Sequence, residues 1–308
     1  MYRKNISTRV SKVYCFIILL FLIGMPFAAC VEGDIVWKDG ILIDGNGSPT
    51  DIEIDDEDAV VIAGDITPNG KTDRDLCLVK YNKDGHMLWK KIYGGEGLDE
   101  IKDIAIDSDR NIIALGRKEN FGQIAKYDLN GNTVWMLGNS GDNETGEKVV
   151  IDPDGNAYAL FTSRSSPDSA VLILRKYDAK GLILWEKEYP ESESDIYCDR
   201  LLLTKDDTVV VLTRILINGS IESKIIRYDG NNGNKLSESE INSAPNLDAT
   251  LDSYDNIVTS SMSANFTTIS KYSLDGKSTW SVTNDNKKEL NLTTMKLDSF
   301  NKIFIVGG

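Results

Sequence analysis

The chain has 308 residues, of which 41% are hydrophobic and 27% are charged, and its formal net charge is −14 at pH 7. This composition is that of a folded protein and excludes wholesale disorder. The excess of acids disfavours nucleic acid as a partner, because a phosphate backbone would be repelled at long range. The length is compatible with two ordinary domains or with one large all-β domain.

Residues 1–29 have the features of an export signal, which is removed from the mature chain. Basic residues without any acid precede an apolar run over residues 15–27. This run is shorter than the roughly 20 residues that a membrane-spanning helix needs. Ala28-Ala29-Cys30 resembles the lipobox of bacterial lipoproteins, which implies a lipid on Cys30 and an anchored location in the bacterial cell envelope, at the outer membrane, in the periplasm or at the cell surface. Phe27 departs from the usual leucine, so secretion without a lipid and a retained membrane anchor stay open.

A repeat follows the signal. In four units a Lys-Tyr pair begins nine residues before a tryptophan, and a glycine stands four residues before that tryptophan. The four tryptophans are Trp89, Trp135, Trp185 and Trp280. In a further unit Arg227 stands in the same relation to Leu236, and Trp37 keeps the same register at the N-terminal side. Because all tryptophans occupy one repeat position, we expect the indoles to pack between neighbouring units.

Each unit predicts four short strands. The first ends near an Asp such as Asp152, and a turn such as Asp154-Gly155-Asn156 leads into a β-branched strand. The third strand ends at the Lys-Tyr pair and the fourth contains the tryptophan. Unit lengths of 44 to 52 residues with four strands each are typical of β-propeller blades. The fold class is therefore predicted to be all-β, with a β-propeller architecture.

Two segments carry a family resemblance. KYNKDGHMLWKKIYGGEGLDEIKDIAIDSDRNIIALG and KYDLNGNTVWMLGNSGDNETGEKVVIDPDGNAYAL resemble the bacterial SBBP-type β-propeller repeats of exported and cell-surface proteins. The resemblance covers about residues 33 to 308. More distantly, the D-x-x-G-x-x-x-W spacing is similar to the tryptophan-docking repeat of PQQ-like propeller lipoproteins, with one residue fewer between Asp and Gly. Both resemblances imply a propeller, and the first is the closer in spacing.

Five units are complete, and a sixth begins at Trp280 and stops at Gly308 after its second strand. The segment at residues 34–37 matches an outermost strand, so we expect it to complete a sixth blade within one domain over residues 30–308. The third strand of that blade has no candidate sequence, so either the blade has three strands or the chain is a shortened product. Cys77 and Cys198 would lie on opposite sides of a six-blade ring, which predicts that both are unpaired.

Residues for catalysis or metal binding are scarce. His86, the only histidine, lies in a predicted solvated turn, so a multi-histidine metal motif is impossible. Residues 152–156 resemble a calcium loop only superficially, because they lack the EF-hand spacing, and Asp and Asn are common in tight turns. We therefore predict no cofactor, no metal and no catalytic residue.

Three arginines form the candidate binding site. Arg117, Arg164 and Arg214 follow the second strands of adjacent units at equivalent places. Acids of the neighbouring loops would share that end of the blades: Glu96, Asp99, Asp142, Glu144, Glu191 and Asp195. Arginines inside an acidic rim could bind an anion or a carboxylate. The alternative is that each arginine pairs with a neighbouring acid, which contributes at most about 1 kcal/mol at a surface.

We expect a monomeric, non-catalytic binding or scaffold module for a protein or a glycan. One alternative is an enzyme, either a PQQ-type dehydrogenase or a glycan-cleaving propeller that uses two carboxylates. Another is a structural surface protein without a specific ligand. Fold alone does not choose among these functions, because propellers carry unrelated activities.

Overall fold

The computed structural model describes most of the chain after residue 44. The described residues are 45–68, 72–94, 97–119, 121–138, 143–166, 169–192, 196–217, 219–241, 248–263, 266–285, 292–298 and 300–307. Their regular structure consists of β-strands only, and these ranges hold no helix long and apolar enough to cross a bilayer. The export signal, Cys30 and the predicted strand at residues 34–37 lie outside the described residues.

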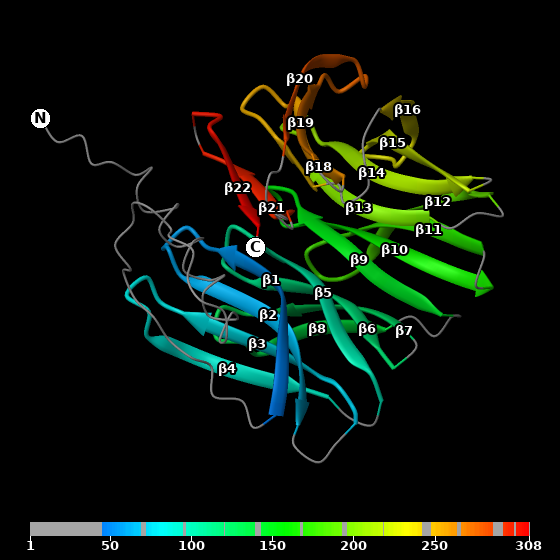
Figure 1. Ribbon diagram of the computed structural model, residues 1–308. Helices are drawn as coiled ribbons and strands as arrows, with labels where there is room; N and C mark the ends of the chain where they lie inside the picture. The colour runs from blue at the N-terminus through cyan, green and yellow to red at the C-terminus, as the bar shows by residue number, and fades with distance from the viewer. Residues whose placement is uncertain are drawn as a thin grey trace, which may run out of the picture. The chain divides into compact units, whose positions relative to one another are not determined.

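The strands form five four-stranded sheets and one two-stranded sheet, which can be followed in chain order in Figure 1. The first sheet contains β1 (Gly45–Ile54), β2 (Val60–Pro68), β3 (Asp75–Tyr81) and β4 (Met87–Tyr93). The second contains β5 (Asp99–Ile106), β6 (Ile112–Lys118), β7 (Phe121–Tyr127) and β8 (Thr133–Gly138). The third contains β9 (Glu144–Ile151), β10 (Ala157–Ser166), β11 (Ser169–Tyr177) and β12 (Ile183–Ser192).

The fourth sheet contains β13 (Ile196–Leu203), β14 (Thr208–Ile217), β15 (Ser220–Asp229) and β16 (Lys235–Ile241). The fifth contains β17 (Asp248–Leu251), β18 (Ile257–Ser263), β19 (Phe266–Tyr272) and β20 (Ser278–Asp285), and β21 (Leu292–Leu297) pairs with β22 (Ile303–Gly307). The chain divides into two compact units after Ile101, within β5. The sheets from β9 onward therefore belong to the second unit.

Each four-stranded sheet is ordered as in the sequence, which confirms the predicted four-strand units. Where the pairings are described, neighbouring strands are antiparallel. The first-to-second and third-to-fourth connections therefore lie at one end of a sheet, which we call the turn end. The second-to-third connection and the passage to the next sheet lie at the other end, which we call the loop end.

The turn end is built by one repeated hydrogen-bond pattern. Asp152 Oδ1 accepts the backbone N–H groups of Asp154 at 3.1 Å and Asn156 at 2.8 Å, and Gly155 has a positive φ of 80°. Asp107 and Asp252 accept backbone N–H groups at the same spacing. Carboxylates that accept backbone and side-chain donors in this way explain the Asp-rich turns without a metal.

A buried ion pair joins the first and third strands at this end of a sheet. Lys80 Nζ lies 2.9 Å from Asp55 Oδ2, and Lys126 Nζ lies 2.8 Å from Asp107 Oδ2. Lys176 with Asp152 and Lys271 with Asp252 repeat the pair. The lysine of each Lys-Tyr pair therefore neutralises the aspartate that shapes the turn. In the fourth sheet Thr204 and Arg227 replace both partners together.

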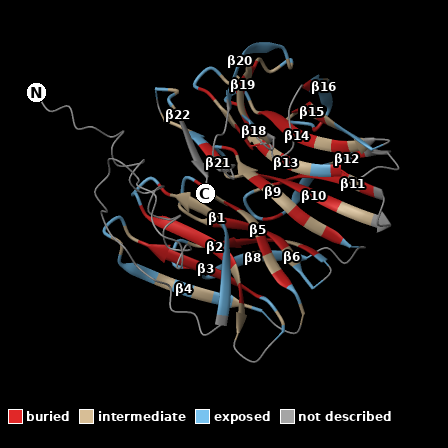
Figure 2. Ribbon diagram, in the orientation of Figure 1, coloured by how far each residue is buried: buried red, intermediate tan, exposed pale blue. Residues whose placement is uncertain are grey.

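The middle strands carry most of the buried residues, whereas the fourth strands are largely exposed or half-buried (Figure 2). Every residue of β3 is buried, and the tyrosines of the Lys-Tyr pairs, such as Tyr81 and Tyr127, are almost wholly inaccessible. Apolar side chains from adjacent sheets form shared clusters, for example around Tyr158 and Tyr228. Burial of such aliphatic and aromatic surface contributes roughly 25 cal/mol per Å² to stability.

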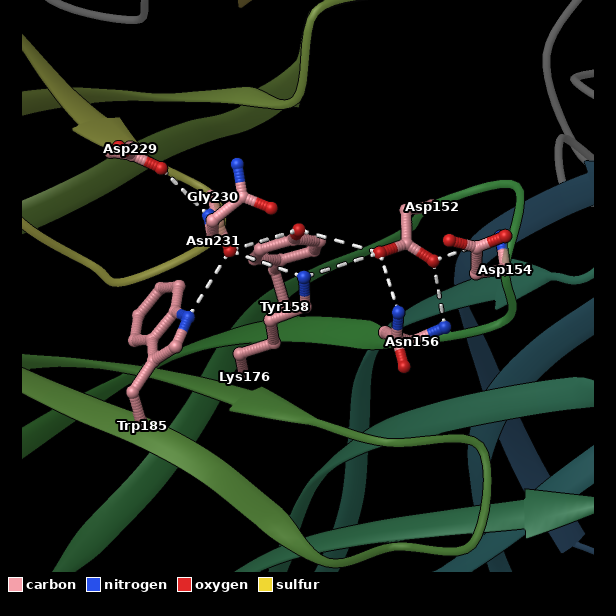
Figure 3. Close-up of polar contacts among 9 residues, drawn as sticks. All are labelled: Asp152, Asp154, Asn156, Tyr158, Lys176, Trp185, Asp229, Gly230 and Asn231. Carbon is pink, nitrogen blue, oxygen red and sulfur yellow. Dashed lines mark hydrogen bonds and ion pairs between the residues drawn. The ribbon is translucent and has the colours of Figure 1, made fainter.

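Tryptophans connect neighbouring sheets, as expected. Trp185 Nε1 donates to the Gly230 carbonyl at 3.1 Å, and Lys176 Nζ and Tyr158 Oη donate to the same oxygen at 3.1 and 3.3 Å (Figure 3). Trp135 Nε1 donates to the Ala179 carbonyl at 3.1 Å in the following sheet. The indoles of Trp135 and Trp185 thus each lie against a turn of the next sheet, which is the structural role predicted for them.

The alignment of Leu236 with the tryptophans is wrong by one residue. The turn from Asp229 to Asn234 is one residue longer than its equivalents, and Arg227 pairs with Ser237 where the other units pair Lys with Trp. Leu236 is instead 50% exposed. The longer turn shifts the register, and a shift of one residue moves a strand side chain to the opposite face.

Candidate functional site

Charged residues gather on the first strands of the second unit. The first strands β9 and β13 each carry a β-bulge, at Glu147 and Asp199, where the register with the second strand shifts by one residue. Lys148 and Arg200 follow these bulge residues directly. Bulges re-aim side chains and are common next to functional sites. We call Asp103, Glu147, Lys148, Asp199, Arg200 and Asp248 the inner-strand cluster.

Asp103 on β5 links two sheets. Its Oδ1 lies 3.0 Å from Lys148 Nζ, and its Oδ2 accepts the Val149 backbone N–H at 2.8 Å. Both side chains of the ion pair are at least four-fifths buried. A carboxylate that accepts one charged and one backbone donor fixes the relative position of β5 and β9.

Asp248 repeats this arrangement between later sheets. Its carboxylate pairs with Arg200 Nε and accepts the backbone N–H groups of Ala249 and Met295. Asp248 is almost wholly buried, whereas Arg200 keeps more than a quarter of its side chain exposed. The carboxylate therefore joins β13, β17 and β21 through three different donors.

The carboxyl group of Glu147 has charged neighbours from several strands. Burial raises its pKa, although Lys102, Lys148 and Arg164 and a hydrogen bond with Thr162 act in the opposite direction. The three cations belong to β5, β9 and β10, so the carboxylate lies where these strands converge. A carboxyl group with a raised pKa among cations can exchange a proton or a counter-ion more readily than a surface glutamate.

Asp199 and Arg214 form a second charged group. Arg214 Nε lies 2.8 Å from both carboxylate oxygens of Asp199, and the guanidinium lies over the Tyr197 ring at 5.7 Å. Burial raises the pKa of Asp199, and the hydrogen bonds from Arg214 oppose that shift. This bidentate contact agrees with the alternative reading of the sequence, in which the arginine pairs with an acid.

Two acids of the predicted rim are buried. Glu144 forms a two-point contact with the Arg175 guanidinium at 2.8 and 3.1 Å, and Arg175 also contacts the Phe161 ring. Asp99 has the equivalent place on β5 and is also buried. The expectation that Asp99 and Glu144 contribute to a solvent-facing acidic rim is therefore wrong. The physical reason at Glu144 is that its side chain, at the start of β9, contacts Arg175 on β11, the third strand of the same sheet, and is therefore turned away from solvent.

The predicted arginines lie at the loop ends of equivalent strands. Arg117, Arg164 and Arg214 stand near the ends of β6, β10 and β14, and all three are half-buried. The Arg164 carbonyl accepts a hydrogen bond from Asn143 Nδ2 at 3.3 Å. Glu96, Asp142 and Asp195 lie outside the described residues, as does the side chain of Glu191, although β12 includes its backbone.

Sequence reasoning missed every residue of the inner-strand cluster. Four members share one repeat position, four residues before the first residue of the turn between first and second strands. They are Asp103, Lys148, Arg200 and Asp248, and the turns begin at Asp107, Asp152, Thr204 and Asp252. The position is constant, but it carries an acid in two units and a base in the other two. Residue identity alone therefore hides the position, whereas the repeat register would have identified it.

The histidine and the two cysteines considered in the sequence analysis lie among the described residues. His86 is exposed in the turn after β3, as predicted, and its backbone N–H donates to Asn82 Oδ1. Cys77 and Cys198 are free thiols, in agreement with the prediction, and burial raises the pKa of both, that of Cys77 to about 11. No group of three metal-ligating side chains occurs within the described part of the chain.

Comparison by sequence finds no relative: no protein-family model matches this chain, and no curated protein matches it. The SBBP-type resemblance therefore remains a resemblance of segments.

Comparison by structure finds propellers. The propeller of Dos1 is similar with a TM-score of 0.52 and 12% identity, covering 86% of this chain and 68% of that one. The β-propeller domain of the Trilobed protease from Pyrococcus furiosus gives 0.52 and 13%, covering 85% and 78%. An acylaminoacyl peptidase from Pyrococcus horikoshii gives 0.54 and 12%, covering 85% of this chain but 43% of that one. The chain has a β-propeller fold, as predicted from the repeat, and the number of blades stays a prediction.

Proposed function

We propose that this chain is an exported binding module, anchored through a lipid on Cys30, that holds a protein or a glycan at the loop end of its blades without chemistry of its own. The observation that carries the proposal is the difference between the two ends of the sheets. The turn end repeats one hydrogen-bond pattern from unit to unit. The loop-end connections differ in length and sequence, as the passages from Ser192 to Ile196 and from Ile241 to Asp248 illustrate. Variable loops on a rigid repeated frame suit recognition.

The charges at that end support a polar or carboxylate-bearing ligand. Arg117, Arg164 and Arg214 stand near the ends of successive second strands. Arg164 lies close enough to Glu147 to lower its pKa, and Arg214 contacts Asp199 directly. A ligand carboxylate could exchange with Glu147 among its three cations, since the ionised form of Glu147 is disfavoured by burial. The inner-strand pairs made by Asp103 and Asp248 would hold this surface rigid.

Replacement of the arginines tests the proposal. The triple variant R117Q/R164Q/R214Q should lose at least tenfold in recovery of a cross-linked envelope partner or in binding to a glycan array. Because R214Q leaves buried Asp199 without its bidentate partner, the variant R117Q/R164Q/R214K serves as a folded comparison, and R214Q/D199N removes both members of the pair. Unchanged recovery by folded R117Q/R164Q/R214K would reject the loop end as the binding surface.

The lipid anchor has its own test. Palmitate labelling of the expressed precursor should mark the wild-type chain and leave Cys30→Ala unlabelled, because the thiol is the attachment atom. Labelling that persists in Cys30→Ala, or a wild-type chain recovered without lipid in the soluble fraction, would remove the anchor from the proposal while leaving the binding module intact.

A further inference from the structure

One position in the turn between first and second strands changes character along the chain. It is the third residue of the turn, and in the first four sheets it is acidic: Glu57, Asp109, Asp154 and Asp206. In the next two sheets it is Tyr254 and Phe300. These rings are 79% and 81% exposed, more than any other large hydrophobic residue among those described. An exposed aromatic at a position that otherwise carries an acid is not explained by packing.

The backbone under both rings is fixed. Tyr254 N–H donates to Asp252 Oδ1 at 2.8 Å, and Phe300 N–H donates to Asp298 Oδ1 at 2.9 Å. The residues that follow the rings, Asp255 and Asn301, have positive φ angles of 61° and 60°. Each aromatic side chain therefore projects from a hydrogen-bonded tight turn. Because the backbone of this turn is already ordered, less conformational entropy is lost when a ligand binds to the ring.

The two turns are also joined to each other. Asn301 Oδ1 accepts the Ser253 backbone N–H at 2.8 Å, and Asn301 Nδ2 donates to Ser253 Oγ at 2.7 Å. Lys205 Nζ from the preceding sheet donates to the Ser253 carbonyl. Tyr254 and Phe300 thus stand on adjacent turns with a fixed relation, and both lie within the second unit.

We infer that Tyr254 and Phe300 form a stacking platform for a neutral glycan at the turn end. The electron-rich faces of aromatic rings attract the C–H groups of a sugar ring, and two rings on linked turns can contact successive sugars. A neutral ligand suits a chain of net charge −14. Asp255, which follows Tyr254 directly, would repel an anionic membrane. This site is separate from the proposed loop-end surface and does not depend on it.

Affinity electrophoresis of the full-length chain tests the inference. Native gels would contain hydroxyethyl cellulose, laminarin, galactomannan or dextran, each at a graded concentration. We expect at least one polysaccharide to retard the wild-type chain, and the double variant Tyr254→Asp/Phe300→Asp to lose retardation at least tenfold. Asp is the residue that three equivalent turns already carry, so this variant should fold. Tyr254→Phe should keep most of the retardation, because the ring remains.

Leu182→Ser is the matched control. Leu182 is 66% exposed and lies at the turn end, directly before β12, but it is far in sequence from the two linked turns. It should migrate as the wild-type chain does. Lack of retardation of the wild-type chain by all four polysaccharides, or equal retardation of the double Asp variant, would overturn the inference. Loss in the double Asp variant of vesicle binding or of self-association, with polysaccharide retardation unchanged, would replace the glycan by a membrane or by a second copy. The arginine variants should leave this retardation unchanged, so failure here and failure of the proposed function are distinguishable.

Discussion

Trp185 Nε1 donates to the Gly230 carbonyl at 3.1 Å across the boundary between two sheets. The same oxygen accepts Lys176 and Tyr158, so three donors from the third sheet converge on one turn of the fourth. The turn approaches so closely because residue 230 has no side chain. A Cβ atom there would lie 2.2 Å from the Asp207 carbonyl oxygen and 2.9 Å from Tyr158 Oη.

Gly230→Ala should therefore destabilise the protein by about 3 kcal/mol, the upper part of the usual range for overpacking, because the nearest obstacle is backbone. Urea unfolding monitored by tryptophan fluorescence measures the effect. Gly138→Ala is the matched control, since a Cβ atom there meets nothing within 4 Å and the backbone has no positive φ. Equal unfolding midpoints for the two variants would contradict the packing argument.

The tryptophans should differ in how much they contribute to the free energy of unfolding, because their burial and their hydrogen bonds to the next sheet differ. Trp185→Phe removes the hydrogen bond to Gly230 and part of the ring, so we expect a loss of about 2 kcal/mol in the free energy of unfolding. Trp280 is 38% exposed, so Trp280→Phe should cost about 1 kcal/mol or less. Thermal unfolding of both variants measures these losses in stability. A larger loss for Trp280→Phe than for Trp185→Phe would show that the contribution of an indole to stability does not depend on how far it is buried.

Much of the fold was predictable from the sequence, because the repeat contains residue types that have strong preferences for turns and for strand ends. The glycine before Trp135 or Trp185 marks a turn, and Asp152 marks the end of a first strand, so strand order followed directly. Leu236 was misaligned because an extra turn residue between Asp229 and Asn234 is invisible when units are aligned on spacing alone. Register depends on the turn that precedes it.

The candidate site was less predictable. Arg214 was identified by its repeat position, but its partner Asp199 was not, because the β-bulge that places Asp199 has no sequence signature. Glu144 was assigned to a surface rim and is buried against Arg175, a contact between the first and third strands that spacing does not reveal. Long-range side-chain pairs of this kind need coordinates.

Replacing only one partner of the buried Lys126–Asp107 ion pair should strongly lower the free energy of unfolding. Lys126→Met leaves the Asp107 carboxylate buried without its cation, so we expect a loss of about 3–5 kcal/mol. The double variant Lys126→Met/Asp107→Asn should recover part of the loss, because Asn can still accept the turn N–H groups without a buried charge. Chemical unfolding at pH 7 measures all three proteins.

Lys118→Met provides the control for this pair, since Lys118 is exposed at the end of β6. Burial alone would raise the pKa of Asp107, but hydrogen bonds from Lys126 and Asn111 lower it overall. Its stabilising contribution is therefore present above the ordinary pKa and is lost as pH falls through the lowered value. A loss in Lys126→Met no greater than in Lys118→Met would show that the pair contributes nothing.

The raised pKa of Glu147 predicts the opposite dependence on pH. Burial raises this pKa above its ordinary value of 4.5, despite the cations Lys102, Lys148 and Arg164. The protonated form is thus favoured in the folded state, so the contribution of Glu147 to stability is present below pH 4.5 and is lost as pH rises through the raised value. Glu147→Gln, which mimics the protonated form, should unfold at a higher urea concentration than the wild-type chain at pH 7.

The difference between the Glu147→Gln and wild-type midpoints should shrink towards zero as the pH is lowered to 4, because both side chains are then neutral. Glu188→Gln is the control, since Glu188 is exposed on β12 and should give the same midpoint as the wild-type chain at each pH. A Glu147→Gln variant less stable than the wild-type chain at pH 7 would mean that the three cations outweigh burial. Glu147 would then be an ionised structural counter-ion and could not exchange with a ligand carboxylate, which would also weaken the proposed loop-end site.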